Sequence, residues 1–468
     1  MPDTFAAGPG RSRVRALVRK YDRPGSRYTS YPSAAEFHDG VTEREVRERL
    51  RASGGEGPRD LSLYLHLPFC RSLCWYCGCT TVITRRQSDS DSYVAGLARE
   101  MTRMAALLPP AGRVVQLHAG GGTPTFLTPG EIRLLGEAVR GAFTLADDVE
   151  AGVEIDPRRL TREHVDALAA AGFNRASLGV QDHDPAVQRA VNRIQPPEVT
   201  ARAAEWVRAA GFRSLNVDLI YGLPHQTVES FERTLADVLA LAPDRLAVFS
   251  YAHVPWMKPA QRLLEGSALP AAGVKLDILL HTVQRLEGAG YVYVGMDHFA
   301  RADDELARAQ REGTLQRNFQ GYSTRAGTDL YGFGMSAISH AHGAFWQNHK
   351  TLDDYGRDVA AGALPVARGY VLTADDHIRG RLIARLMCDA RLDFAALGAS
   401  LGVDVREYFR TELAALAPLA EDGLVDLGAD GLAVTRLGRL FLRNLAMCFD
   451  PRARRADADP SRRWSRTV

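Results

Sequence analysis

Four of the chain's six cysteines fall within one stretch, FCRSLCWYCGC, at residues 69–79. Cys70, Cys74 and Cys77 follow the spacing C-x3-C-x2-C, and Cys79 comes two positions later. Closely spaced thiolates are soft ligands that suit zinc or an iron–sulfur cluster. Zinc ribbons usually present two C-x2-C pairs on separate loops, and the sequence has no second pair. The spacing therefore favours a four-iron cluster held by three thiolates, which leaves one iron open to another ligand; zinc is the alternative.

The fourth cysteine of the stretch, Cys79, has two possible roles. It is either the fourth ligand of a closed electron-transfer cluster or a non-ligand that lines the site. Only one residue separates it from Cys77, which is an awkward spacing for two ligands on different irons of one cubane. We therefore predict that Cys79 is not a ligand. Cys388 and Cys448 lie in helical segments, where we expect buried structural cysteines.

Composition excludes several classes of protein. The chain has 468 residues, 46% of them hydrophobic and 24% charged, with a net charge of +2, so no global field favours nucleic acid or an anionic membrane. No apolar run approaches the roughly 18 residues of a membrane-spanning helix, and the N-terminus lacks the apolar core of a secretory signal. We expect a cytoplasmic monomer without nucleic-acid or membrane partners. In a reducing compartment, clustered thiols are more often ligands than disulfides.

The first twenty residues permit two readings. The segment 11–20 is rich in arginine and has no acidic residue, as in an organelle transit peptide. Val14, Leu17, Val18 and Tyr21 fall at helical spacing, so we favour an amphipathic helix docked on the body of the protein.

Strand-like and helical segments alternate over residues 61–300, which predicts an α/β fold with a (β/α) barrel or a partial one. Several strand candidates are near-continuous apolar runs, as in parallel strands covered on both faces. One helix start is well marked by Thr128 as N-cap, Pro129 in the first turn and Glu131 three residues after the cap. The seven predicted strands are 61–68, 114–121, 150–156, 175–182, 215–222, 245–252 and 291–300.

Polar residues follow the ends of these predicted strands. In a barrel of parallel strands, the carboxyl ends carry the site, so we expect seven strand ends to converge on one mouth. The residues concerned are Cys70, Gly120–Thr123, Glu154, Asp156, Gln181, Asp218, Tyr221, Tyr251 and His253.

The pattern predicts four regions. Residues 1–55 form an N-terminal helix and an arm over the barrel mouth, and 56–365 form the barrel with an extension. Residues 366–450 form a mostly helical domain with a small hairpin near 424–435, and 451–468 form a basic, solvated tail. The order of elements in the helical domain is similar to that of a winged helix. Because the domain is not conspicuously basic, we favour a lid or scaffold role over DNA binding.

Several segments, taken in order, closely resemble the family of oxygen-independent coproporphyrinogen III oxidases, within the radical S-adenosylmethionine (radical SAM) superfamily. The resemblance runs from about residue 20 to 450. It implies a radical SAM partial barrel, a [4Fe-4S] cluster and two S-adenosylmethionine molecules. It also implies oxidative decarboxylation of two propionates of coproporphyrinogen III to vinyl groups, giving protoporphyrinogen IX in anaerobic haem biosynthesis, with an unidentified electron donor and acceptor. The segments include RYTSYP, LYLHLPFCRSLCWYCGC, LHAGGGTPTFL, VEIDPR, NVDLIYGLPHQT and RNFQGYSTRAGTDLYGFGMSAIS.

The same resemblance implies roles for individual residues, although no side chain is assigned as catalytic. Tyr76 stands where phenylalanine is expected and Ala119 where a larger residue is expected. The implied cluster ligands are Cys70, Cys74 and Cys77; the contacts of the first S-adenosylmethionine are Tyr64, Gly121, Glu154 and Ile338; those of the second are Tyr76, Gly122, Thr123, Gln181, Arg193, Asp218 and Ala252.

The chemistry of these residue types is consistent with such roles. The glycines 120–122 allow a ligand to approach the backbone closely, although a plain flexible turn has the same sequence. Glu154 and Asp218 can accept hydrogen bonds from hydroxyl or amino groups. Arg193 can hold a carboxylate in a bidentate pair, although most arginines simply lie on the surface.

Contacts to the substrate carboxylates are left open. Arg27, Arg317, His253 and His298 are candidates. We expect the arm RYTSYP, residues 27–32, to fold over the barrel mouth; a packed arm without a role in the site is the alternative.

Two other functions fit part of the pattern. A related group of radical SAM proteins acts as haem chaperones, but it typically lacks both a cysteine at the position of Cys79 and the RYTSYP arm. A radical methyltransferase is the more distant alternative, and it would release S-adenosylhomocysteine instead of 5′-deoxyadenosine.

Overall fold

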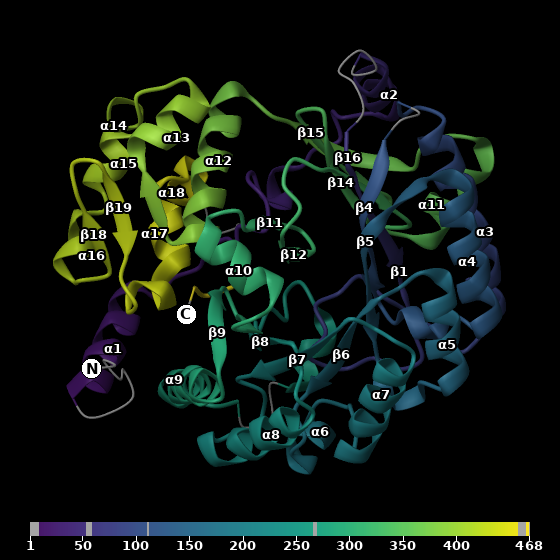
Figure 1. Ribbon diagram of the computed structural model, residues 1–468, viewed down its shortest axis with the longest axis horizontal. Helices are drawn as coiled ribbons and strands as arrows, with labels where there is room; N and C mark the ends of the chain where they lie inside the picture. The colour runs from purple at the N-terminus through teal and green to yellow at the C-terminus, as the bar shows by residue number, and fades with distance from the viewer. Residues whose placement is uncertain (1–8, 53–58, 110–111, 265–268, 457–464, 468) are drawn as a thin grey trace.

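A twelve-stranded sheet runs through the larger part of the molecule (Figure 1). The computed structural model describes residues 9–52, 59–109, 112–264, 269–456 and 465–467. Seven neighbouring strands are parallel, in the order β13-β1-β4-β5-β6-β7-β8. The edge strands β16 and β9 lie at opposite ends of the order, so the curved sheet is a partial barrel, as predicted. The parallel strands are β13 (Asp329–Phe333), β1 (Leu61–Leu67), β4 (Arg113–Gly121), β5 (Thr144–Ile155), β6 (Arg175–Gln181), β7 (Ser214–Tyr221) and β8 (Arg245–Ser250).

Helices lie along the outside of the parallel strands (Figure 1). The strand β1 reads as an apolar run because all its residues except Tyr64 are buried, whereas β6 alternates between buried and partly buried residues. The predicted start of α4 is confirmed: Thr128 and Glu131 form a reciprocal capping box, with Pro129 in the first turn. The helices are α3 (Ser88–Ala105), α4 (Pro129–Ala142), α5 (Arg162–Ala171), α6 (Pro185–Ala190), α7 (Pro197–Ala209), α8 (Val228–Ala240) and α9 (Ala272–Gly288).

The prediction of seven converging strands needs one correction. The segment 291–300 is not one parallel strand but an antiparallel pair, β9 (Tyr291–Gly295) and β10 (His298–Arg301). The chain reverses at Met296 and Asp297, which both have positive φ, 41° and 77°. Gly295 and Asp297 are turn-forming residue types, but they lie within the aromatic run YVYVGMDHF, which the prediction treated as one strand.

The seventh parallel strand is β13, which the sequence did not reveal. It pairs with β1 from the other side, far from the strand–helix repeat. Three antiparallel strands extend the sheet beyond it: β14 (Ile338–Ala341), β15 (Ala344–Asn348) and β16 (Val366–Val371). These strands are short, and only α11 (Leu352–Ala361), between β15 and β16, interrupts them, so they lack the regular alternation of strand and helix that identifies the others.

The C-terminal part has its own core. It contains the helices α12 (Ala374–Asp389) and α17 (Leu442–Cys448) and a small sheet in the order β17-β19-β18. The expected hairpin is confirmed as β18 (Val425–Leu427) and β19 (Gly431–Val434). Cys388 and Cys448 are buried there, as predicted.

Both chain ends pack against this C-terminal core. The predicted amphipathic helix is α1 (Pro9–Tyr21), whose Val14 and Leu17 are buried among C-terminal side chains. In the arm, Tyr28 and Tyr31 join the same core. We expected a solvated C-terminal tail; residues 457–464 and 468 lie outside the described residues, whereas the backbone of residues 465–467 is hydrogen-bonded to that of residues 23–25.

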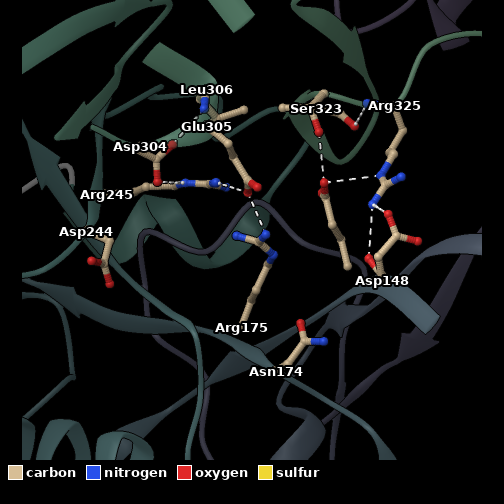
Figure 2. A network of polar contacts seen from close by, with 12 residues as sticks. Asp148, Asn174, Arg175, Asp244, Arg245, Asp304, Glu305, Leu306, Ser323 and Arg325 are labelled. Atoms are coloured by element: carbon tan, nitrogen blue, oxygen red, sulfur yellow. Dashed lines mark hydrogen bonds and ion pairs between the residues drawn. The ribbon is translucent and has the colours of Figure 1, made fainter. Parts of the chain in front are cut away.

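The amino ends of the strands are closed by ion pairs (Figure 2). Glu305, at the start of α10 (Glu305–Glu312), accepts bonds from Arg175 of β6 and Arg245 of β8, both at 2.5 Å. On the other side of this network, Arg325 bonds Asp148 of β5 at 3.0 Å. The network therefore occupies the end of the barrel opposite the carboxyl ends of the strands, which are left to form the site.

A buried carboxylate fixes the turn after β13. Glu100 of α3 is 2% exposed and accepts hydrogen bonds from the Gly334 amide at 2.8 Å, Asn348 at 2.7 Å and the Tyr355 hydroxyl at 2.7 Å. Burial raises the pKa of Glu100 to about 7, although these three donors oppose the shift. Glu100 thus binds a proton more tightly in the folded than in the unfolded protein.

We predict a specific pH dependence for Glu100→Gln. A raised pKa destabilises the wild type as pH rises from about 4.5 through 7, by ~3 kcal/mol at most. The amide of the variant does not titrate and so escapes this loss. Any stability deficit of Glu100→Gln at pH 5, where both side chains are neutral, should therefore shrink towards pH 8. Urea unfolding of both proteins across this range measures the difference. A deficit that stays constant or grows with pH would contradict the assignment.

Candidate active site

A cavity of about 480 Å³ opens at the carboxyl ends of the parallel strands. It unites twelve of the fourteen residues that the sequence singled out, from segments as distant as Cys70 and Ala252. A volume of this size suits a small-molecule or cofactor site. The twelve are Cys70, Cys74, Tyr76, Cys77, Gly121, Gly122, Thr123, Glu154, Gln181, Arg193, Asp218 and Ala252.

Three of the thiols in this cavity come from the loop after β1. Cys70 ends the short strand β2 (Phe69–Cys70), and its Sγ lies 3.3 Å from the Thr123 hydroxyl. Cys74 is buried, and its Sγ is 3.6 Å from Arg158 and 3.7 Å from Arg193. Within the described residues no three potential ligands lie close enough to hold a single metal ion. Three thiols around one cavity, with two cations nearby, fit a larger multi-iron group.

Cys77 and Cys79 act as a pair. A hydrogen bond from Cys79 lowers the pKa of Cys77 to about 6, and the same interaction raises the pKa of Cys79 well above its usual value. Cys77 is therefore the better thiolate, and Cys79 is the proton donor. Burial raises the pKa of Cys70 to about 11, so its thiolate needs a metal to form at neutral pH.

The cations beside Cys74 are held by a carboxylate. Asp156 forms a bidentate pair with Arg158, at 3.0 and 2.6 Å, and a second pair with Arg193 at 3.3 Å. Burial alone would raise the pKa of Asp156, but Arg193 and then Arg158 lower it to about 2. The sequence-based prediction identified Asp156 only as a residue at a strand end and did not include Arg158. The signal for Arg158 was its position in the motif VEIDPR, two residues after Asp156, which caps a short helix.

Glu154 is the second carboxylate at the strand ends. It accepts hydrogen bonds from the Gly121 amide at 3.1 Å and His118 at 3.3 Å. Burial opposes its charge, yet these donors, led by His118, hold the pKa of Glu154 below its usual value. It is thus an ionised acceptor at neutral pH.

Two of the fourteen residues lie beside the cavity rather than in its lining. Tyr64 stacks on His118 with ring centroids 6.1 Å apart, and its hydroxyl lies 3.1 Å from His66. Ile338 begins β14, next to the turn that Glu100 holds. Neither residue is part of the cavity lining.

Packing requires glycine at positions 120–122, in addition to any close approach of a ligand to the backbone. A Cβ on Gly120 would lie 2.6 Å from the Glu154 carboxylate, and one on Gly122 would lie 2.5 Å from the Pro68 carbonyl. Gly121 has a φ of +105°, and its Cβ would meet the His66 ring at 2.4 Å. The three glycines allow β1, β4 and the cysteine loop to approach each other.

Asp218 faces the cavity from the end of β7. It accepts hydrogen bonds from Ser177 at 2.7 Å and Asn216 at 2.8 Å. Burial raises the pKa of Asp218 to about 6, and these donors only partly counter the effect. Gln181, at the end of β6, has a positive φ of 69°.

Only one of the four candidates for substrate carboxylates lines the cavity. Arg27 does so and also forms an ion pair with Asp297. Arg317 instead donates to the backbone carbonyls of Arg27 and Tyr28. Burial lowers the pKa of His298 to about 4, so its ring is neutral. His253 bonds the Tyr251 hydroxyl at 2.9 Å.

Comparison with known proteins identifies two family models within the chain. Residues 64–238 match the radical SAM superfamily, and residues 372–441 match the model described as the HemN C-terminal domain. The first match contains the cysteine loop and the ends of β1 to β7.

Curated relatives match over nearly the whole length. The oxygen-independent coproporphyrinogen III oxidase of Salmonella typhimurium is 48% identical over 93% of this chain and 94% of its own. The enzyme of the same name from Pseudomonas aeruginosa is 47% identical over 93% and 95%. The solved coproporphyrinogen III oxidase of Escherichia coli, described as a radical SAM enzyme, superposes with a TM-score of 0.89, at 46% identity over 94% and 98%.

We predict different effects for two neighbouring cysteine substitutions. Cys77→Ser should lose the iron–sulfur cluster, because it removes the thiolate with the lowered pKa. Cys79→Ser should keep the cluster, because the serine hydroxyl can still donate to Cys77. Iron and acid-labile sulfide in anaerobically purified protein, with the visible spectrum, measure the result. Loss of the cluster in both variants would make Cys79 a ligand.

Proposed function

Because the chain belongs to the family of oxygen-independent coproporphyrinogen III oxidases, we propose that it converts coproporphyrinogen III to protoporphyrinogen IX by decarboxylating two propionates to vinyl groups. The observation that carries the proposal is the single cavity that unites three thiols with Glu154, Arg193 and Asp218 at the carboxyl ends of the strands. When bound, a [4Fe-4S] cluster and S-adenosylmethionine supply one-electron abstraction of a hydrogen atom from carbon. Cys70, Cys74 and Cys77 would hold the cluster.

The protein's own contribution is position and exclusion of water. Glu154 is ionised and points into the cavity, so it can accept hydrogen bonds from an amino or hydroxyl group of the first S-adenosylmethionine. Asp156 neutralises part of the charge of Arg158 and Arg193, and those cations in turn face Cys74. Arg27 is the one candidate carboxylate contact that lines the cavity.

We also propose a second S-adenosylmethionine in the same cavity. Arg193 Nε is buried and has no hydrogen-bond partner within the described residues, and a ligand carboxylate would satisfy it. Asp218 offers a carboxylate nearby on β7. Together with Tyr76, Gly122, Thr123, Gln181 and Ala252, these residues form the wall away from Tyr64 and Ile338.

The C-terminal part supports this proposal as a scaffold. Its core holds α1 and the arm residues Tyr28 and Tyr31, which leaves the next arm residue, Arg27, at the cavity. Among the helices of the described residues, none combines the length and apolarity needed to cross a membrane. A cytoplasmic location, a monomeric state and the absence of nucleic-acid partners stay predictions.

A turnover assay tests the main proposal. Anaerobic protein with coproporphyrinogen III, S-adenosylmethionine and dithionite should release carbon dioxide and form protoporphyrinogen IX and 5′-deoxyadenosine. Tight haem binding without vinyl product would indicate a chaperone, which the named relatives do not favour. S-adenosylhomocysteine as the product would indicate a methyltransferase.

A further prediction tests whether the protein binds two S-adenosylmethionine molecules. Asp218→Asn has nearly the same shape but lacks the charge, so the second equivalent should bind about tenfold more weakly or not at all, while the cluster and the first equivalent are retained. Anaerobic equilibrium dialysis with labelled S-adenosylmethionine counts the sites in both proteins. A wild type that binds one equivalent, or a variant that still binds two, would contradict the proposal.

A further inference from the structure

We propose that the outer face of the cysteine loop is the docking surface for an acidic, one-electron carrier protein that reduces the enzyme. The inference rests on the proposed function, since that reaction needs an electron from outside. The carrier is oxidised by one electron, and the cluster held by Cys70, Cys74 and Cys77 takes up that electron. We call this surface the cysteine-loop face and define it below by its residues.

Two segments are bonded directly to the backbone of the cysteine loop and flank it. Asn192 donates to the Leu73 carbonyl at 2.8 Å, and the Trp75 amide donates to the carbonyl of residue 191 at 3.0 Å. From the other side, Gln261 donates to the Tyr76 carbonyl at 3.0 Å, and Lys258 donates to the Cys79 carbonyl at 2.8 Å.

A small apolar core ties these segments together. Val187 and Val191, in and after α6, pack with Leu264 and with Trp75 and Tyr76 of the loop. The loop, the turn after α6 and the 3-10 helix Pro259–Leu264 therefore form one rigid wall of the cavity. The loop reaches solvent at the cavity mouth, where the exposed Cys79 lines the cavity together with Ile83 and Gln261.

Exposed apolar side chains are concentrated on these segments. Of the nine large apolar side chains that are exposed within the described residues, five belong to them or to β3 (Val82–Ile83), which pairs with Cys70. Clustered exposed apolar residues of this kind usually mark an interaction site. The five are Ile83 (45% exposed), Ile194 (56%), Trp256 (44%), Met257 (62%) and Leu263 (57%).

The charge of the same segments is one-sided. The stretches 69–88, 189–197 and 251–264 contain seven arginines and lysines and no aspartate or glutamate, although the whole chain carries a net charge of only +2. Arg193 is buried inside, and Arg86 pairs with Asp89. In the described part of the chain, no ion pair joins Arg85, Arg189, Lys258 or Arg262 to a carboxylate.

An apolar centre with basic residues around it is complementary to a protein with an acidic rim about its redox group. Opposite charges steer such an encounter and fix its orientation, and salt weakens it. Cations at the cavity mouth would also attract the carboxylates of the substrate. The experiment therefore separates docking of the carrier protein from binding of the substrate.

The test is a double charge reversal, Arg189→Glu/Arg262→Glu, in the anaerobic cluster-containing enzyme. Its matched control is Arg19→Glu/Arg391→Glu, which makes the same change of net charge on α1 and β17 (Arg391–Asp393), within the C-terminal part. The probe is a purified acidic flavodoxin in its fully reduced form. Three measurements compare the proteins: flavodoxin binding, the rate at which flavodoxin bleaches the cluster absorbance, and turnover with dithionite.

We expect the face variant to bind flavodoxin about tenfold more weakly and to be reduced more slowly by a similar factor. Its turnover with dithionite and its KM for coproporphyrinogen III should match the wild type, and the control variant should match in every measurement. Raising the salt should weaken flavodoxin binding to the wild type more than to the face variant.

Two outcomes would overturn the inference while leaving the proposed function intact. Equal flavodoxin binding and reduction in all three proteins would show that the carrier docks elsewhere. A raised KM for coproporphyrinogen III with dithionite, without a change in flavodoxin binding, would show that the face guides the substrate instead. A wild type that fails to turn over with dithionite would instead count against the proposed function.

Discussion

The buried guanidinium group of Arg193 is the interaction on which the site most depends. It is 6% exposed, pairs with Asp156, donates to the Gly179 carbonyl at 2.5 Å and lies 3.7 Å from Cys74 Sγ. A buried ion is tolerated only with close partners of opposite charge. Cys74, the carboxylate of Asp156 and the two arginines must therefore be assembled together, and removing one of them leaves an uncompensated charge. This explains why the ends of β1, β5 and β6 converge so closely.

The sequence predicts the fold well where strands and helices alternate. The first six predicted strands match β1 and β4 to β8, because at least one helix separates each of them from the next along the chain. The sequence fails where strands are short and antiparallel. The turn at Met296 and Asp297 was missed although Gly295 and Asp297 are turn-forming residue types. The strands β13 to β16 depend on contacts with distant parts of the chain, such as the bond from the Gly334 amide to Glu100, and no local pattern encodes those contacts.

The site was predictable to the extent that its residues stand at strand ends or in a dense motif. The spacing of Cys70, Cys74 and Cys77 indicated a cluster without any structure, and the resemblance supplied most of the other residues of the cavity. The charge pairing was missed. The motif VEIDPR places Arg158 two residues after Asp156, but the pair of Asp156 with Arg193 joins segments that are far apart in the sequence. Packing also requires the glycines, since side chains at 120–122 would collide with Glu154, His66 and Pro68.

The cysteine loop must both shield the thiols from water and let electrons reach them. Its inner face shields the thiols, with Cys74 buried and Tyr76 packed against the small core behind it. The loop reaches solvent at Cys79, which is exposed and lines the same cavity, so electrons have a short path to the thiols. A cluster buried more deeply would be better protected but slower to reduce, and one fully exposed would lose the dry surroundings that radical chemistry needs. Bonds from Asn192, Lys258 and Gln261 fix the loop between these extremes, and Gln261 also lines the cavity.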